Sequence, residues 1–449
     1  MATKDATANR IEAFLRNGPA DAASIIKSLD ISQPTFSRLW PNISHGIAIG
    51  AARARQYAIR RQIPGVEDTI PVYQISAKGE IEAFGDLIPL EGDSYVFYSP
   101  DGTSHEVFRG LPFFLCDLKP QGFLGRLVPR NNQDLALPES ILAWTDDDVL
   151  RYLVIRGEAL PGNLLLGNQS YLTFLRNGNE HNGFDVVVEA SQRASSYPCL
   201  VELVMKDGSP GSSAGGEQPK FVVTLDNSRH LIVKFSPPID TPNGRRWADL
   251  LACEHIALDV LNSNGIPAAT SSIIDVGGRR FLEVDRFDRT SQGGRLPMIT
   301  MSGLDGNLGM LDQKWSKAAA ELHDHGYLSR ENMRRIEVLD LFGSLIGNSD
   351  RHHGNIAFSW DRDQNLALLP VYDMLPMFYR PNQHGEVVKN TWELNSKESL
   401  VFSHLPFVAG LASKFWDNVL ADPLISDDFK AVARAHLDAL YQLNSKLKP

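Results

Sequence analysis

The chain has 449 residues, of which 43% are hydrophobic and 22% charged, and this composition is typical of a soluble globular protein with about two to four domains. No apolar run approaches the ~20 residues that cross a bilayer, and the first residues lack the apolar segment of a signal peptide. The three cysteines, Cys116, Cys199 and Cys253, are far apart, which argues against a disulfide framework or a zinc site. We therefore expect a cytoplasmic protein without a membrane segment.

The net charge of −10 is unevenly distributed along the chain. Residues 1–64 contain nine lysines and arginines against four acidic residues, so this segment carries +5 and the remainder carries −15. A basic segment joined to an acidic body predicts that only the N-terminal part contacts nucleic acid.

Residues 1–65 have the pattern of a winged helix-turn-helix. Leu29 to Ile31 form a short connection between two apolar helical patterns, and Ser32 is a good N-cap for the second helix. A turn at Gly50, followed by strand-like residues 57–59, predicts a β-hairpin wing. The base-contacting residues would be Gln33, Thr35, Ser37 and Arg38, and the residues contacting the phosphates of duplex DNA would be Arg53, Arg55, Arg60 and Arg61. A helical protein-interaction module is the alternative.

Residues 66–200 have the pattern of short strands separated by Pro, Gly and Asp turns, with shorter helices towards the end. This region contains no motif that indicates chemistry, so we expect a β-rich scaffold. Residues 201–290 differ, because a stretch rich in glycine and serine at 206–220 leads into two strands and then a helix over about 246–264.

A glycine-rich loop followed by a lysine on a strand is typical of a phosphate-binding site. The backbone at Gly215 and Gly216 is predicted to contact phosphates, although a flexible linker would have the same composition. Lys234 lies on the second strand, where its ammonium can reach the phosphates of ATP. Glu254 on the next helix is the candidate partner for this lysine, by analogy with the lysine–glutamate pair of protein kinases, and a solvated helix glutamate is the alternative.

A strand at residues 283–287 lies where two lobes would meet, so its backbone would be exposed to an adenine base. The residues predicted to bind nucleotide at this hinge are Glu283, Val284, Asp285 and Phe287. The remaining residues, 291–449, are predicted to form a mainly helical lobe.

The strongest chemical signal is the segment Asn348 to Asn355, which follows an apolar helix and precedes a hairpin. A kinase needs a carboxylate that orients the attacking hydroxyl, and an Asn and a second Asp that hold Mg²⁺ against the phosphates. Asp350, Asn355 and Asp373 supply these groups in the expected chain order. A metal site built on His352 and His353 is disfavoured, because Mg²⁺ prefers oxygen ligands.

Five motifs resemble those of the HipA kinase family and occur in the family's order: SSAGGEQPK (212–220), LIVKF (231–235), LEVDRFDR (282–289), NSDRHHGN (348–355) and YDMLP (372–376). The resemblance extends over residues 66–445. It implies a Ser/Thr protein kinase with Asp350 as the catalytic aspartate, Asn355 and Asp373 as the magnesium ligands and Lys234 as the ATP lysine.

The resemblance also implies regulation and partners. In this family a serine of the glycine-rich loop is autophosphorylated, which here implies Ser212, with Ser213 and Ser209 as alternatives. The implied substrate is a protein of the translation machinery, whose phosphorylation slows growth. Typical members use a separate antitoxin to bind DNA, whereas this chain has its own basic head, as in the variant subgroup labelled YjjJ or HipH; whether it needs an antitoxin is left open.

The sequence therefore predicts an α+β protein in which a winged helix-turn-helix (1–65) precedes a two-lobed kinase that uses ATP and Mg²⁺. The kinase would comprise a β-rich subdomain (66–200), an ATP-binding lobe (201–290) and a helical lobe (291–449). A small-molecule or lipid kinase is one alternative, because the segment SDRHHGN is also similar to the loop of phosphoinositide kinases. A nucleotide-sensing, DNA-binding regulator without catalysis is another.

Overall fold

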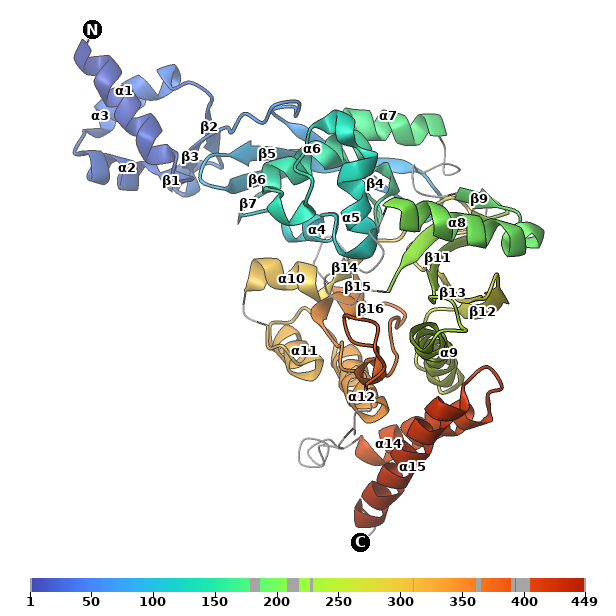
Figure 1. Ribbon diagram of the computed structural model, residues 1–449. Coiled ribbons are helices and arrows are strands. Elements are labelled where there is room, and N and C mark those ends of the chain that lie inside the picture. Colours follow the sequence, from blue (N-terminus) through green and yellow to red (C-terminus); the bar gives the residue numbers. More distant parts are fainter. Residues whose placement is uncertain are drawn as a thin grey trace.

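The computed structural model describes residues 2–177, 186–207, 218–226, 229–309, 311–360, 365–388, 392 and 404–447. The N-terminal head lies at one end of an elongated molecule, and helices α14 (Leu405–Ala421) and α15 (Asp427–Leu447) lie at the other (Figure 1). Between them come a β-rich middle part, a second sheet, and the helices that carry the segment 348–355. The mixed α+β class that was predicted is confirmed.

The head contains three helices and a three-stranded antiparallel sheet of strand order β1-β3-β2. Ser32 caps the third helix by accepting a hydrogen bond from the Thr35 amide, and a proline in the first turn has no amide hydrogen to satisfy. The predicted hairpin is present as β2 and β3. The elements are α1 (Ala2–Leu15), β1 (Ala20–Asp21), α2 (Ala22–Leu29), α3 (Gln33–Leu39), β2 (Gly46–Ile49) and β3 (Gln56–Ile59).

The hairpin of the head packs against the next sheet. One apolar cluster joins the two parts, and its buried members are Ile49, Ala58, Ile88, Leu90 and Val96. The amide of Glu91 donates a hydrogen bond to the carbonyl of Ile59 at 2.9 Å. The boundary predicted at residue 65 therefore separates two parts that share a hydrophobic core.

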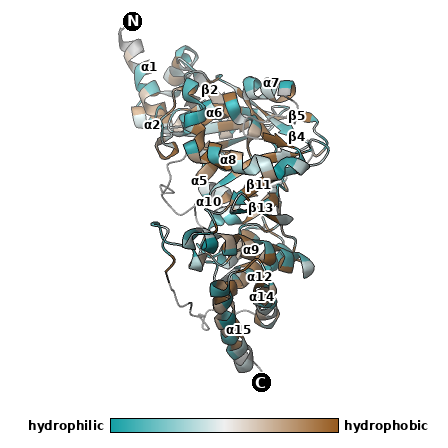
Figure 2. Cartoon of the chain, turned by 45° about the vertical axis from the view of Figure 1, so that its right-hand side comes forward, coloured by the Kyte–Doolittle hydropathy of each residue, from teal (hydrophilic) through white to brown (hydrophobic). Residues whose placement is uncertain are grey.

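The middle part is a five-stranded antiparallel sheet of order β7-β6-β5-β4-β8, with helices packed beside it. Figure 2 shows hydrophobic stretches on β4 and β5, while helix α6 carries hydrophilic residues as well. Its strands are β4 (Ile70–Ile75), β5 (Ile81–Leu90), β6 (Ser94–Tyr98), β7 (His105–Arg109) and β8 (Leu164–Leu166). Its helices are α4 (Phe113–Cys116), α5 (Gly122–Asn131), α6 (Asp146–Arg156) and α7 (Gly167–Asn177).

A second five-stranded sheet has the order β12-β13-β11-β10-β9. Because β9 pairs in parallel with β10, this sheet begins at Val186, and the boundary predicted at residue 200 is wrong, since it falls inside helix α8. Strand β9 has only three residues, too few for a local pattern to predict it. The elements are β9 (Val186–Val188), α8 (Arg193–Asp207), β10 (Lys220–Leu225), β11 (Arg229–Phe235), α9 (Pro242–Ser263), β12 (Ser271–Val276) and β13 (Arg279–Asp285).

The C-terminal lobe is mainly helical, as predicted, and contains one small sheet of order β14-β15-β16. Among the described residues, no helix is long and apolar enough to span a membrane. The elements are β14 (Ile299–Thr300), α10 (Met301–Leu308), α11 (Trp315–Asp324), α12 (Arg330–Ile346), β15 (Ala357–Trp360) and β16 (Leu366–Leu368), followed by α14 and α15.

Candidate active site

Three ionisable side chains that are far apart in the sequence meet between the helical lobe and the sheet of order β12-β13-β11-β10-β9. Lys234 lies on β11, Glu254 on α9, and Asp373 in the loop after β16. The Lys234 ammonium donates to both carboxylate oxygens of Glu254, at 2.6 and 2.7 Å, and also contacts Oδ1 of Asp373. Lys234 is 6% exposed and Glu254 is fully buried. Buried charges of this kind are tolerated when opposite charges are in direct contact, so the predicted pairing is present.

The ionisation of Asp373 and Lys234 follows from their mutual contact. Burial alone would raise the pKa of the Asp373 carboxyl, but the positive charges of Lys234 and Lys220 outweigh burial and lower this pKa to about 2. Burial alone would lower the pKa of Lys234, but the carboxylates of Asp373 and Glu254 raise it. At neutral pH the site therefore contains an ionised Asp373, whose oxygens can interact with a cation.

The backbone at Asp373 is in the left-handed region, with φ of 53°. Residues other than glycine rarely adopt this conformation, although aspartate tolerates it better than most. Such conformations are concentrated at functional sites, where the surrounding structure enforces them. Here the enforced turn places the carboxylate of Asp373 against Lys234.

The segment 348–355 is a loop held by its own side chains. Helix α12 ends at Gly347, whose φ of 78° is accessible to glycine and allows the chain to turn away. The buried Asn348 accepts a hydrogen bond from the amide of Asp350 at 3.0 Å, and Asn355 donates from Nδ2 to the carbonyl of Asp350 at 2.8 Å. The Oδ1 of Asn355 has no hydrogen-bond donor among the described residues, so it remains available to a ligand.

Neighbouring elements fix this loop. Arg351 donates from Nε to Asp340 on α12 at 3.1 Å, so its role is structural. Trp315 donates its indole N–H to the carbonyl of His352 at 3.0 Å, and Tyr372 donates its hydroxyl to the carbonyl of Gly354 at 2.7 Å. The described residues contain no cluster of three or more His, Cys, Asp or Glu side chains that could hold a metal, so His352 and His353 build no such site there.

Two adjoining cavities surround these groups. The first, of about 360 Å³, has an apolar lining that includes Val222, Ile232, Val284, Phe287 and Tyr372. The second, of about 380 Å³, is more polar and contains Glu254, Asp350 and Asn355. Both cavities are lined by Gln121, Lys220, Lys234, Thr300, Gly354 and Asp373, so they form one continuous site. Apolar space beside a cluster of convergent charged groups is typical of a ligand site.

The predicted hinge residues fall into two groups. Val284, Asp285 and Phe287 line the apolar cavity, as expected. Glu283 lines neither cavity, because its buried side chain points the other way and accepts hydrogen bonds from three partners. These partners are Arg193 at 3.0 and 3.2 Å, Tyr197 at 2.6 Å and Ser272 at 2.7 Å. The side chain of Glu283 therefore joins helix α8 to the sheet, and the predicted contact of the hinge backbone with an adenine base stays a prediction.

Replacing Glu283 with glutamine is expected to lower the free energy of unfolding by about 1–3 kcal/mol, because Arg193 would lose a buried charge partner. Nucleotide affinity should remain unchanged. Urea denaturation measures the free energy of unfolding, and a nucleotide titration measures the affinity. The control is Glu189→Gln, at an exposed glutamate between β9 and α8. A loss of nucleotide affinity at unchanged stability would contradict this structural role of the Glu283 side chain.

Several residues of the site escaped the sequence interpretation. Lys220 lies directly opposite Lys234 in the β10–β11 register, so both side chains are on one face of the sheet. The sequence pattern could have indicated Lys220, because this lysine directly follows the glycine-rich stretch. Asp117 accepts hydrogen bonds from the amide and hydroxyl of Thr300, at 2.5 and 2.7 Å, and so joins the middle part to the helical lobe beside the cavity. No local pattern marks this contact.

The glycine-rich loop cannot be placed relative to these groups. Gly215, Gly216, Ser209, Ser212 and Ser213 all lie outside the described residues. Their predicted roles remain predictions. The described chain resumes at Gln218, which lines the polar cavity.

In the head, most of the residues predicted to contact DNA are on the surface. Those that are exposed are Gln33, Ser37, Arg38, Arg53 and Arg55, whereas Thr35 is partly buried and lies 2.9 Å from the hydroxyl of Ser32. The expected phosphate contact of Arg61 is wrong, because its guanidinium forms ion pairs with Asp93 and Asp147, both at 3.1 Å. Arg61 instead fastens the head to the middle part.

Comparisons with known proteins agree with the order of these parts. The family model of the YjjJ-like toxin middle domain matches residues 66–175, and that of the HipA-like C-terminal domain matches residues 212–427. Toxin YjjJ of Escherichia coli (strain K12) is 34% identical over 444 residues, which cover 97% of this chain and 98% of the relative.

Several solved structures also match the chain. HipA from a Shewanella oneidensis MR-1 complex with HipB and operator DNA has 14% identity and a TM-score of 0.49, covering 83% of this chain and 96% of its own. The Helicobacter pylori proinflammatory kinase CtkA has 14% identity and a TM-score of 0.34, covering 51% and 88%. The sequence matches alone decide the family. Given an identity of 34% along nearly the whole of both sequences, the chain belongs to the YjjJ-like toxins, whose C-terminal part is a HipA-like domain.

Proposed function

We propose that this protein is an ATP- and Mg²⁺-dependent kinase that phosphorylates serine or threonine residues of a protein and thereby inhibits growth. The observation that carries the proposal is the convergence of Lys234, Glu254 and Asp373 beside Asp350 and Asn355 in one cavity. Phosphoryl transfer is catalysed almost entirely by positioning and charge stabilisation, and these are the groups that it requires.

The two cavities suggest how the chain would hold its substrates. The apolar cavity suits the adenine base, and Lys220 and Lys234 suit the phosphates at the junction. Asn355 and Asp373 would hold Mg²⁺, since one offers an unpaired amide oxygen and the other an ionised carboxylate; the ion would neutralise charge on the phosphates. Asp350 would accept a hydrogen bond from the attacking hydroxyl and align it with the γ-phosphorus.

The specificity for protein is tested by incubating the purified chain with labelled ATP, Mg²⁺ and a cell lysate. We expect label on protein, including the chain's own loop serine, and phosphoproteomics should identify a protein of the translation machinery. Label that appears only in the small-molecule fraction would instead support the small-molecule or lipid kinase alternative.

We further propose that the head binds duplex DNA as a winged helix-turn-helix. Supporting this, Gln33 and Arg38 are exposed on α3, and the segment that contains them is basic within an acidic chain. Such binding releases counterions, so it should weaken as salt increases.

The double substitution Gln33→Ala with Arg38→Ala is expected to reduce duplex affinity at least about tenfold, because each base contact contributes about 1–3 kcal/mol of discrimination. Fluorescence anisotropy with duplex DNA from 50 to 200 mM salt measures this. Arg109→Ala, at an exposed arginine on β7, should have no effect. Equal loss in both variants, or no duplex binding at low salt, would contradict the proposal.

A further inference from the structure

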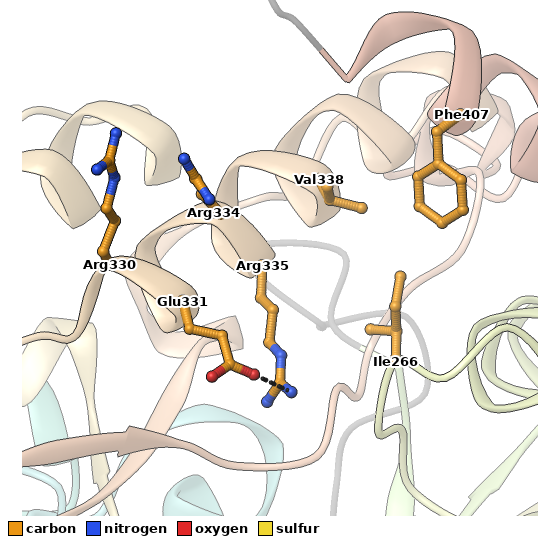
Figure 3. Close-up of a pocket in the computed structure, with 7 residues that line it drawn as sticks. All are labelled: Ile266, Arg330, Glu331, Arg334, Arg335, Val338 and Phe407. Carbon is orange, nitrogen blue, oxygen red and sulfur yellow. Dashed lines mark hydrogen bonds and ion pairs between the residues drawn. The ribbon is translucent and has the colours of Figure 1, made fainter.

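A hollow of about 320 Å³ lies on the helical lobe, apart from the nucleotide cavity. It is formed by the N-terminal half of α12, the start of α14 and the connection that follows α9. Ile266 and Val338 in its floor are buried, whereas Phe407 beside them is 51% exposed. Ile266 and Phe407 face each other next to Val338 (Figure 3). The exposed ring of Phe407 and the two buried aliphatic side chains together give this hollow an apolar floor.

Arginines of α12 border this floor. Arg335 forms an ion pair with Glu331 at 2.6 Å, whereas Arg330 and Arg334 are exposed and have no acidic partner within the described part of the chain (Figure 3). The hollow therefore combines an apolar floor with two positive charges that no described acidic side chain pairs with, in a chain whose net charge is −10. We call this surface, lined by Ile266, Arg330, Glu331, Arg334, Arg335, Val338 and Phe407, the arginine groove.

We propose that the arginine groove docks an acidic segment of a protein partner that carries a large apolar side chain. The apolar side chain would cover Ile266, Val338 and Phe407, and flanking carboxylates would pair with Arg330 and Arg334. Arginine suits this task, because its planar guanidinium donates two parallel hydrogen bonds to one carboxylate. A nucleic acid would supply negative charge but no aliphatic group for the apolar floor, so the floor favours a peptide.

The position of the groove suggests that the docked partner is the substrate, and this step rests on the proposed function. Helix α12 begins at the groove and ends directly before the loop that carries Asp350. Its 17 residues span about 25 Å at 1.5 Å per residue. A docked segment could therefore present a hydroxyl to Asp350 through about eight extended residues. Docking would raise the local concentration of the acceptor without touching the catalytic groups.

The test measures fluorescence anisotropy of a fluorescein-labelled peptide in which glutamates and aspartates flank a Leu-Phe pair. Two further probes are the same peptide with serines in place of Leu-Phe and a twelve-nucleotide polyuridylate. The full-length chain carries Arg330→Glu with Arg334→Glu, or Phe407→Ala. The matched control is Lys414→Glu with Arg434→Glu, which changes the net charge equally at exposed positions of α14 and α15.

We expect the acidic Leu-Phe peptide to bind and its affinity to fall at least tenfold in the Arg330/Arg334 variant and several-fold in Phe407→Ala, with no change in the control. Autophosphorylation should persist in every variant, which separates a failure of docking from a failure of the proposed kinase activity. No peptide binding, equal loss in the control, or indifference to the serine replacement overturns the proposal. Tighter polyuridylate binding that is insensitive to Phe407→Ala also overturns it.

Discussion

Replacement of Asp350 by asparagine is expected to lower the rate of phosphoryl transfer at least about a hundredfold, because the attacking hydroxyl loses the carboxylate that orients it. The shape of the side chain is retained, and the amide of residue 350 can still donate to Asn348, so the loop should keep its structure. Labelled phosphate transferred to protein is the readout, together with growth arrest on expression. Nucleotide affinity should change little, since Asp350 lies in the polar cavity and not in the apolar one.

The control for this variant is Asp417→Asn, at an exposed carboxylate on α14. A thermal unfolding curve equal to that of the wild type ensures that lost activity is not lost folding. If Asp350→Asn kept full transferase activity and growth arrest, the assignment of the catalytic carboxylate would be wrong. If it lost transfer but kept growth arrest, the non-catalytic regulator would be favoured.

Replacement of Lys234 by methionine is expected to destabilise the fold by about 3–5 kcal/mol, because removing one partner of a buried ion pair leaves an uncompensated charge. Glu254 is fully buried and would face Asp373 without the ammonium between them. Nucleotide binding should also be lost, since one of the two lysines at the junction of the cavities disappears. Urea denaturation and calorimetric nucleotide titration measure the two effects.

A second variant separates the effects of charge and packing. Combining Lys234→Met with Glu254→Gln removes both charges of the buried pair, so most of the lost stability should return while nucleotide binding stays absent. If the double variant were as unstable as Lys234→Met alone, the pair would stabilise the fold by side-chain packing and not by its charges.

The pH dependence of stability follows from the lowered pKa of Asp373. Its pKa is about 2 in the fold and about 3.9 in an unfolded chain. The contribution of Asp373 is therefore fully present above about pH 4 and is lost as the pH falls towards 2. The pH midpoint of acid unfolding should be higher in Asp373→Asn than in the wild type. It should be higher still in Lys234→Met, because that variant removes the partner of both carboxylates.

The sequence was sufficient to locate a site residue when its role depends on the spacing of nearby residues along the chain. Lys234 could be placed on a strand by its apolar neighbours, and the spacing from Asp350 to Asn355 to Asp373 identified a loop, a hairpin and a second acidic residue. The pairing of Lys234 with Glu254 could be proposed only by analogy, because 19 residues separate them and they lie on different elements, a strand and a helix. The structure brings them to 2.6 Å because β11 and α9 pack against each other.

The sequence could not predict on which face of a strand each side chain lies. Glu283 and Val284 are neighbours on β13, and successive side chains on a strand point to opposite faces. Glu283 therefore faces Arg193 and Tyr197 while Val284 lines the cavity, and the sequence could not tell which of the two side chains lies on the cavity face. The domain boundary predicted at residue 200 is wrong because β9 belongs to the second five-stranded sheet. Only its pairing with β10, which is distant in the sequence, shows this.

The sequence by itself determined the family, the α+β class, the charge asymmetry between head and body, and the polar residues that converge in the candidate site. These properties depend on residue identity and short-range spacing, which are explicit in the chain. Only the tertiary structure decided that the head shares a core with the middle part, that Arg61 is held by acidic side chains, that Gln121 and Thr300 line both cavities of the candidate site, and that Phe407 lies beside Ile266. Each of these is a contact between segments far apart in sequence, and such contacts depend on the packing of whole elements, which no local pattern specifies.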